Sequence, residues 1–274
     1  MKDFSERVAV ITGAASGIGQ QLALQLAQRG AVLALADKDY RGLSETLRQV
    51  EAVGGVASLY ELDVSDAAAF QAFADAVVRK HHAIHVLINN AGVTLLDSIE
   101  EQSHEDLAWL MNINFWAVVY GTKAFLPYLK KAEEAHIVNI SSIFGMMAVP
   151  LHSAYNASKF AVRGYTEALA IEMTGTNVSV SCVHPGGIKT NIARNARVSH
   201  KELRHAREKV SLGFDDAAKT TSERAAKLII RGVERRQRRV LIGLDAWLID
   251  KIVRIFPAAY ARIFRLHKLF KKIK

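Results

Sequence analysis

The feature that most constrains the fold is a repeated alternation of short apolar runs with longer stretches of helical spacing. The apolar runs predict strands at residues 7–11, 31–36, 56–62, 85–88, 136–140 and 178–183. Apolar residues at helical spacing predict helices near residues 18–29, 40–53, 66–80, 103–131 and 155–174. Continuous apolar strands that alternate with helices are typical of a parallel sheet covered on both faces. With a helix at 222–236 and a last strand at 240–242, we predict a single α/β domain over residues 1–243, built on a doubly wound, mostly parallel, seven-stranded sheet.

Composition agrees with one packed domain of this size. Half of the 274 residues are hydrophobic, 23% are charged and only 4 are proline, which argues against a disordered chain. The single cysteine, Cys182, excludes an internal disulfide framework and is expected to be a small buried residue of the strand at 178–183. The first seven residues carry four charges and no apolar leader, and the uncharged stretch 135–158 is too polar to span a membrane. We therefore expect a cytoplasmic protein.

Two segments fall outside the alternation of strands and helices. Residues 187–221 form a long, basic and polar connection, which is typical of a lid or of a disordered segment. Residues 244–274 form a C-terminal extension with eight basic and two acidic residues, a net charge of +6 out of +9 for the chain. The arginine-rich run at 231–239 matches no nucleic-acid-binding module, so we predict a solvated surface there and no nucleic-acid partner.

Pro257 divides the extension into two predicted helical pieces, and the second, residues 258–274, has the pattern of a basic amphipathic helix. Its apolar stripe consists of Tyr260, Ile263, Phe264, His267, Phe270 and Ile273, with basic residues largely between them. Such a helix either lies on an anionic membrane surface or packs against the body or another subunit, and the sequence leaves both open. His267 is interpreted as a packed or interfacial residue rather than a metal ligand, and no metal site is predicted.

A glycine-rich turn follows the first predicted strand. It reads Thr12-Gly13-Ala14-Ala15-Ser16-Gly17-Ile18-Gly19 and precedes a predicted helix, so that a close backbone approach and a helix N-terminus favour a pyrophosphate, as in a Rossmann fold. Asp37 closes the second strand, where a carboxylate can bind both ribose hydroxyls of NAD. Lys38 follows directly and could accept the 2′-phosphate of NADP. We therefore predict NAD and leave NADP open.

Three further residues combine into a candidate catalytic group. Tyr155 and Lys159 lie four residues apart on one predicted helix, so that both project from the same face. An ammonium near a phenol favours the phenolate, so Lys159 is expected to lower the pKa of Tyr155 toward the range of a general acid or base. Ser142 lies at the carboxyl end of the strand at 136–140, where doubly wound sheets bind ligands.

These residues, in this order, resemble the short-chain dehydrogenase/reductase superfamily in its common NAD(P)-dependent form. The resemblance covers residues 5–243 and adds the motifs Asp63-Val64, Asn89-Asn90-Ala91-Gly92, Asn114 and Pro185-Gly186-Gly187-Ile188-Lys189-Thr190. Asn114 fits the superfamily's catalytic asparagine better than Asn112 does, although Ala117 stands where a glycine is usual. The resemblance implies an oxidoreductase that moves a hydride between a nicotinamide cofactor and a CH–OH or C=O group.

The resemblance also implies a role for each matching residue. Tyr155 would exchange a proton with the substrate oxygen that Ser142 binds, Lys159 would lower the pKa of Tyr155 and hold the nicotinamide ribose, and Asn114 would support a water between Lys159 and solvent. The implied cofactor-binding residues are Gly13, Ser16, Gly17, Ile18, Gly19, Asp37, Lys38, Asp63, Val64, Asn90, Ala91, Gly92, Tyr155, Lys159, Pro185, Gly186, Ile188 and Thr190. A homodimer or homotetramer is implied as well.

The residues expected to face the substrate are mostly apolar. They are residues 93–96, Ile143, Phe144, Met146, Met147, Val149, Leu151 and the lid from Ile188 onward. We predict a lipophilic alcohol or ketone of steroid, retinoid, fatty or terpenoid type rather than a sugar, whose hydroxyls need buried partners. The alternative for these side chains is that some simply fill the core. The alternative functions are a 3-oxoacyl-carrier-protein reductase, which the extension disfavours, and a non-catalytic NAD(P)-sensing binding protein, which Ser142, Tyr155 and Lys159 disfavour.

Overall fold

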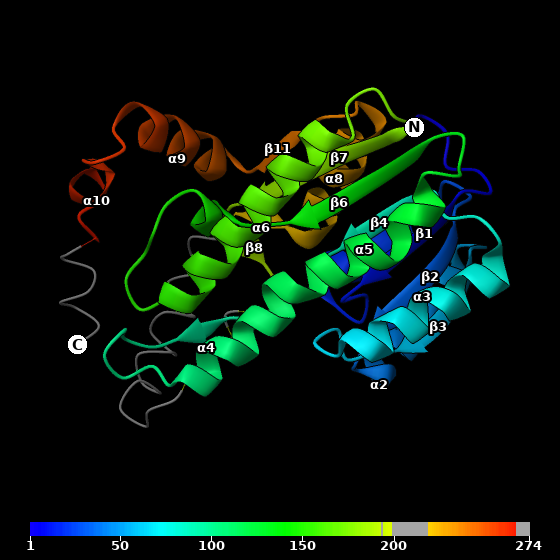
Figure 1. Ribbon diagram of the computed structural model, residues 1–274, viewed down its shortest axis with the longest axis horizontal. Helices are drawn as coiled ribbons and strands as arrows, with labels where there is room; N and C mark the ends of the chain where they lie inside the picture. The colour runs from blue at the N-terminus through cyan, green and yellow to red at the C-terminus, as the bar shows by residue number, and fades with distance from the viewer. Residues whose placement is uncertain (193, 199–218, 267–274) are drawn as a thin grey trace.

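The computed structural model describes residues 1–192, 194–198 and 219–266, and its centre is a seven-stranded sheet (Figure 1). The strand order is β11-β7-β6-β4-β1-β2-β3, and every neighbouring pair runs parallel. These strands are β1 (Val8–Thr12), β2 (Val32–Asp37), β3 (Val56–Glu61), β4 (Val86–Asn89), β6 (Ala135–Ile140), β7 (Val178–Pro185) and β11 (Arg239–Ile242). The predicted doubly wound fold is confirmed. Its strand order reverses between β1 and β4, at the point where such sheets bind ligands.

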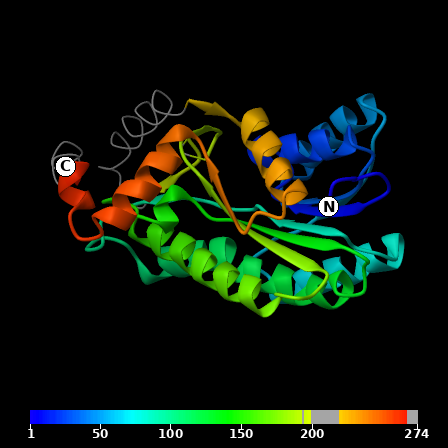
Figure 2. The same ribbon diagram turned by 90° about the horizontal axis from the view of Figure 1, so that it is seen from above.

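Helices cover both faces of the sheet (Figure 2). One layer consists of α1 (Gly17–Ala27), α2 (Tyr40–Ala52) and α8 (Ser222–Glu234). The other consists of α3 (Ala67–His81), α5 (Ala117–Leu129) and α6 (Ser153–Glu172). The strands are buried from both sides, which explains why β1 is apolar at four consecutive positions and buried at all five.

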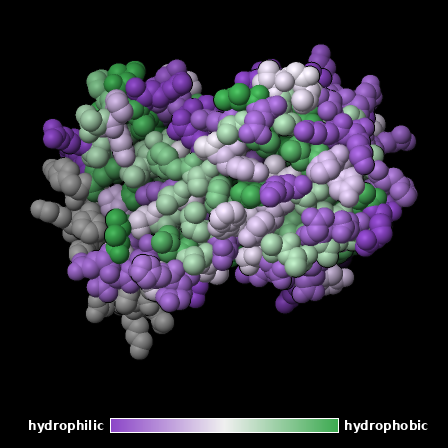
Figure 3. All heavy atoms as spheres, viewed as in Figure 1, coloured by the Kyte–Doolittle hydropathy of each residue, from purple (hydrophilic) through white to green (hydrophobic). Residues whose placement is uncertain are grey.

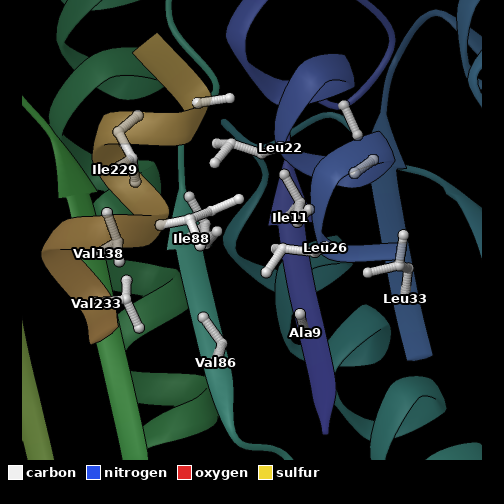
Figure 4. Packing of buried hydrophobic residues seen from close by; sticks show 14 of the residues in the cluster. Ala9, Ile11, Leu22, Leu26, Leu33, Val86, Ile88, Val138, Ile229 and Val233 are labelled. Atoms are coloured by element: carbon white, nitrogen blue, oxygen red, sulfur yellow. The ribbon is translucent and has the colours of Figure 1, made fainter. Parts of the chain in front are cut away.

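The core between α1, α8 and the sheet is a continuous apolar layer. Figure 4 shows Leu22 and Leu26 of α1 and Ile229 and Val233 of α8 against the strands, among them Ile11 of β1. All five side chains are at most 2% exposed. Burial of this kind contributes about 1.5–3 kcal/mol for each large apolar side chain, so this layer fixes the strands that carry the site.

The predicted helix at 103–131 is interrupted in the structure. α4 (His104–Met111) is followed by a π-helical segment, Asn112–Trp116, before α5 begins. A π-helical turn holds an additional residue and is often found at functional sites, and the apolar pattern on either side does not reveal it. Four short strands also lie outside the sequence-based assignment: β5 (Leu95–Leu96), β8 (Ile188–Lys189), β9 (Arg197–Val198) and β10 (Thr220–Thr221), in two small sheets.

The described part of the C-terminal extension, residues 244–266, lies at the end of the molecule opposite β3 (Figures 1 and 2). α9 (Leu244–Ile255) and α10 (Tyr260–Ile263) flank the predicted break at Pro257. The middle of the predicted lid, residues 199–218, and the end of the predicted amphipathic helix, residues 267–274, lie outside the described residues. Cys182 is buried in β7 as expected, and within the described ranges no helix combines the length and apolarity needed to cross a membrane.

Candidate active site

The conformation of the glycine-rich turn requires glycine at three positions. Gly13 and Gly17 have φ angles of +67° and +56°, which favour glycine. A Cβ atom on Gly19 would lie 2.0 Å from the carbonyl oxygen of Gly13, so only glycine fits there. Ser16 is the N-cap of α1, and its side chain makes no capping hydrogen bond. The turn therefore brings an uncommitted hydroxyl and a helix N-terminus together, which fits the pyrophosphate of a dinucleotide.

Asp37 lies at the carboxyl end of β2 beside this turn. Its carboxylate accepts hydrogen bonds from the backbone N–H of Ala15 (3.0 Å) and of Asp39 (3.1 Å). Hydrogen bonds from Ser65 hold the pKa of the Asp63 carboxyl below its usual range, and the charge of the exposed Lys38 lowers it further. The carboxylate thus faces the glycine-rich turn, as the ribose contact of NAD requires, whereas the charge of Lys38 is partly directed at Asp63.

The segment after β4 supports the glycine-rich turn from the other side. The amide Nδ2 of Asn90 donates to the carbonyl oxygens of Thr12 and Gly13, both at 3.0 Å. The hydroxyl of Thr12 accepts from the backbone N–H of Asn90 (3.1 Å) and of Ala91 (3.2 Å). Asn90 and Ala91 therefore fix the shape of the turn. Val64, which follows Asp63 after β3, is buried close to this edge of the sheet.

Asn114 lies in the π-helical segment and is fully buried. Its Oδ1 accepts from the backbone N–H of Val93 (2.8 Å), and its Nδ2 donates to the carbonyl of Val93 (2.9 Å) and to the Ser158 hydroxyl (3.1 Å). The side chain therefore joins the loop after β4 to α6. A Cβ atom on Gly92 would lie 3.3 Å from Asn114 Oδ1 and 3.4 Å from Lys159 Nζ, so this loop passes close to the candidate catalytic group.

The structure brings Ser142, Tyr155 and Lys159 together. The hydroxyl of Ser142 accepts from the backbone N–H of Phe144 (3.1 Å), and the Ser142 side chain lies near enough to the Tyr155 phenol to lower its pKa. The Nζ of Lys159 donates to the carbonyl oxygen of Ile140 at 3.0 Å and lies 5.6 Å from the centroid of the Tyr155 ring. The segment after β6 thus places the Ser142 hydroxyl at one edge of the sheet, and α6 places the Tyr155 phenol and the Lys159 ammonium beside it.

The pKa of Tyr155 differs from the expectation. Burial raises the pKa of Tyr155 to about 12, and the Ser142 side chain opposes this only in part. Burial also lowers the pKa of Lys159 to about 8. In this structure desolvation of the phenol outweighs any lowering of the Tyr155 pKa by the ammonium of Lys159, which donates to Ile140.

The loop after β7 lies opposite the glycine-rich turn. The backbone N–H of Gly186 donates to the carbonyl of Ile242 (2.9 Å), and Pro185 pairs with the same residue in the sheet. Ile188 begins β8, which pairs with β10. A Cβ atom on Gly17 would lie 3.4 Å from the side chain of Thr190, so the two ends of the predicted cofactor site face each other.

Two residues of the extension hold loops of this site, and sequence reasoning did not find either. Asp245 Oδ2 accepts from the backbone N–H of Gly187 at 2.7 Å, and the Tyr260 hydroxyl accepts from the backbone N–H of Ala148 at 3.1 Å. The partners are far apart in the chain, and no spacing pattern connects them. The glycines at positions 186 and 243 are the available hints, since a Cβ atom on either would lie within 2.2 Å of the Asp245 carboxylate.

Comparison with known proteins decides the family. The sequence profile described as short chain dehydrogenase matches residues 7–201. This chain is a short-chain dehydrogenase/reductase. It is 46% identical to SadH of Mycobacterium tuberculosis, which is described as an oxidoreductase, over 96% of this chain and 95% of that protein. It is also 35% identical to the 3-ketodihydrosphingosine reductase of Bacteroides thetaiotaomicron, over 70% of this chain and 68% of that protein.

A solved structure of the same family matches the fold of nearly the whole chain. The crystal structure of a short-chain dehydrogenase/reductase from Burkholderia phymatum in complex with NAD has a TM-score of 0.87 and 31% sequence identity, and the alignment covers 93% of this chain and 95% of that chain. The glycine-rich turn, the uncommitted Ser16 hydroxyl and the Asp37 carboxylate fit the same class of cofactor. This short-chain dehydrogenase/reductase is therefore an NAD(P)-dependent oxidoreductase.

Proposed function

We propose that this enzyme oxidises or reduces a lipophilic alcohol or ketone of steroid, retinoid, fatty or terpenoid type. The observation that carries the proposal is the apolar surrounding of Tyr155, whose ring packs against the buried cluster of Leu95, Leu110 and Ala154. The ring of Phe144 also meets Tyr155 edge to face at 6.0 Å between centroids. A sugar bound against the half-buried rings of Phe144 and Tyr155 would leave its hydroxyls without partners, which costs about 1–3 kcal/mol for each buried group.

Each catalytic residue is assigned a task by its contacts. The protonated phenol of Tyr155 donates its proton to the substrate oxygen during reduction and takes it back during oxidation. Ser142, whose side chain lies beside the Tyr155 phenol, holds that oxygen within reach. Lys159 supplies positive charge beneath the phenol and a donor for the cofactor ribose. When bound, the nicotinamide ring supplies or accepts the hydride.

Asn114 is assigned a positioning role. Both ends of its side-chain amide are bound, to Val93 and to Ser158, so the side chain holds the loop after β4 against α6. A water between Lys159 and solvent, which the family resemblance implies for this residue, would have to use its backbone instead.

NAD is the preferred form of the cofactor in this proposal. The Asp37 carboxylate is held toward the glycine-rich turn by Ala15 and would repel a 2′-phosphate, whereas Lys38 is exposed and partly directed at Asp63. Asp37→Ala should lower the ratio of kcat/KM with NAD to kcat/KM with NADP. In Lys38→Ala the ratio should still favour NAD. Equal efficiency of the unaltered enzyme with both cofactors would contradict this preference.

The substrate class is tested with a panel of carbonyl compounds. Oxidation of NADH is measured with steroid, retinoid, long-chain fatty and terpenoid ketones or aldehydes, with sugars and with a 3-oxoacyl thioester. Higher kcat/KM for the lipophilic compounds supports the proposal. Preference for a sugar would contradict it. Preference for the 3-oxoacyl thioester would favour the second candidate, an acyl-carrier reductase, for which the positive charge of the chain offers a docking surface for an acidic carrier.

A further inference from the structure

The first helix of the extension, α9, is apolar on its outer face. Leu244, Trp247, Leu248 and Ile255 are 87%, 54%, 51% and 66% exposed, and their spacing places them along one side of the helix. The opposite side carries Ala246 and Asp250, which are buried against the body. This arrangement reverses the usual one, in which the apolar side of a surface helix faces inward.

The apolar stripe continues past the end of α9 and is bordered by positive charge. Phe256 and Ile263 are 49% and 47% exposed, and the exposed basic residues beside the stripe are Lys251, Arg254, Arg262 and Arg265. Figure 3 shows strongly hydrophobic residues gathered over the region of α9 with hydrophilic residues next to them. We call this surface the extension face: Leu244, Trp247, Leu248, Ile255, Phe256 and Ile263, with the four basic residues.

Both acidic residues of the extension contact the body, although Asp245 itself is exposed. Asp245 and Asp250 are the two acids in residues 244–274. Asp245 accepts a hydrogen bond from Gly187, and Asp250 forms ion pairs with Arg239 and, more distantly, with Arg254. The extension face therefore presents apolar side chains and cations, while Asp250 is buried and the exposed Asp245 is bound to Gly187.

We propose that the extension face docks on an anionic lipid bilayer. Apolar and aromatic side chains enter the boundary between headgroups and acyl chains, and lysine and arginine remain at the level of the anionic headgroups. Trp247 suits that boundary, and Lys251 lies 5.9 Å from its ring centroid, so that apolar and cationic groups are adjacent. A second copy of this chain fits less well, because a two-fold contact of this face with itself brings its cations against one another.

Docking in this position would affect how the substrate reaches the enzyme. This consequence rests on the proposed function. The hydroxyl of Tyr260, on α10, accepts a hydrogen bond from Ala148, in the loop between Ser142 and Tyr155. A bilayer bound to the extension face would therefore lie beside the loop on the substrate side of the catalytic group. A lipophilic alcohol or ketone dissolved in the membrane would then reach the enzyme without crossing bulk water.

The test is co-sedimentation of the full chain with vesicles of phosphatidylcholine alone or mixed with phosphatidylserine, at about 0.05 M and about 0.5 M salt. We expect the chain to pellet with the anionic vesicles at low salt and to be released at high salt. Leu248→Asp should abolish binding, whereas Ile99→Asp, at a residue 81% exposed outside the extension, should leave it unchanged. Lys251→Ala should weaken binding about fivefold, and Lys80→Ala on α3 should not.

Two results would overturn the proposal. One is a full-length chain that stays in the supernatant with anionic vesicles at low salt. The other is a Leu248→Asp variant that pellets with anionic vesicles like the unaltered protein; if Leu248→Asp instead changes the size of the protein in solution and the unaltered protein does not bind vesicles, the extension face is a contact between copies. Vesicle binding is measured without substrate, so its failure leaves the proposed oxidoreductase activity unaffected, and failure of the substrate panel leaves the docking result unaffected.

Discussion

The body of the molecule and its C-terminal extension differ in which side chains their helices bury. In the body, α1 buries Leu22 and Leu26 completely or nearly so and lets its polar residues face outward. In α9 the leucines Leu244 and Leu248 are exposed, and the buried side carries the charged residue Asp250. The body is therefore stabilised by apolar burial, whereas α9 leaves both leucines exposed and contacts the body partly through polar groups.

These polar contacts end on the loops of the active site. Asp245 binds Gly187 on the predicted nicotinamide side, and Tyr260 binds Ala148 on the predicted substrate side. A substitution in the core should accordingly change the free energy of unfolding, while a substitution in the extension should change binding constants. The difference between the two regions can be tested by making the same chemical change in each.

The largest effect is expected from removal of one tyrosine hydroxyl. Tyr155→Phe removes the proposed proton donor and should lower kcat by about 10²–10⁴-fold, with cofactor binding retained because the phenol is not its main anchor. Tyr260→Phe removes a hydroxyl in the extension and should change KM for the substrate far more than kcat. Steady-state kinetics and cofactor titration measure both. Near-normal turnover of Tyr155→Phe would exclude the proposed mechanism.

A leucine truncation compares packing in the two regions. Leu22→Ala leaves a cavity in the core under α1 and should lower the free energy of unfolding by about 2–5 kcal/mol. Leu248→Ala removes a side chain that is 51% exposed and should stay within about 0.5 kcal/mol. Urea denaturation of both variants gives these values. Equal losses would mean that α9 is packed as tightly as α1.

Acid should destabilise the body through two buried histidines. Burial lowers the pKa of His136 to about 3 and that of His184 to about 4, so both are neutral in the folded chain. Below their ordinary pKa of 6.5 the unfolded chain binds the protons first, so stability is complete above that pH and is lost as pH falls toward 3–4. The slope is about 1.4 kcal/mol per pH unit for each histidine.

The matched variants for this pH dependence are His136→Gln and His104→Gln. The first removes a buried imidazole and should reduce the slope between pH 6 and 4 by about one proton. The second changes an exposed residue of α4 and should leave the slope as it was. Denaturation midpoints at several pH values provide the measurement, and an unchanged slope in His136→Gln would contradict the assignment.

The smallest effect is expected at the joint between the two regions. Asp245→Ala removes the acceptor of the Gly187 N–H, a bond worth about 1 kcal/mol at this partly exposed position, and should weaken cofactor binding about fivefold. Asp245→Asn keeps an acceptor oxygen and should recover most of the affinity. The dissociation constant of NADH, followed by its fluorescence, distinguishes them. If both variants bind like the unaltered enzyme, the extension does not position this loop.

Much of the body was accessible from the sequence because its signals are local. The strands of the main sheet lie within two residues of their predicted limits, since each is a continuous apolar run. The structure also gathers Gly13, Asp37, Asn114, Ser142, Tyr155 and Lys159 at one edge of that sheet. Their chemical roles, the division of the chain at residue 243 and the oligomeric state stay predictions.

The features missed depend on contacts that no local pattern records. The π-helical segment around Asn114 differs from an α-helix by one residue, and the apolar spacing continues on both sides. The pKa of Tyr155 depends on how deeply the phenol is buried and on the carbonyl of Ile140 that binds Lys159, neither of which follows from the i and i+4 spacing. The bonds of Asp245 and Tyr260 join residues 58 and 112 positions apart.

The strand order also governs when the enzyme becomes active during folding. β1 pairs with β4 by placing Val10 beside Leu87, and Gly186 is bound by Ile242 near the end of the sheet. Pairings between such distant residues carry a high entropic cost of loop closure and raise the contact order, so they form slowly. The glycine-rich turn leaves the ribosome early, yet the loop that faces it is secured only after β11 has been made. Catalytic activity is therefore a late signal in folding, and its return after denaturation should lag behind that of helical structure.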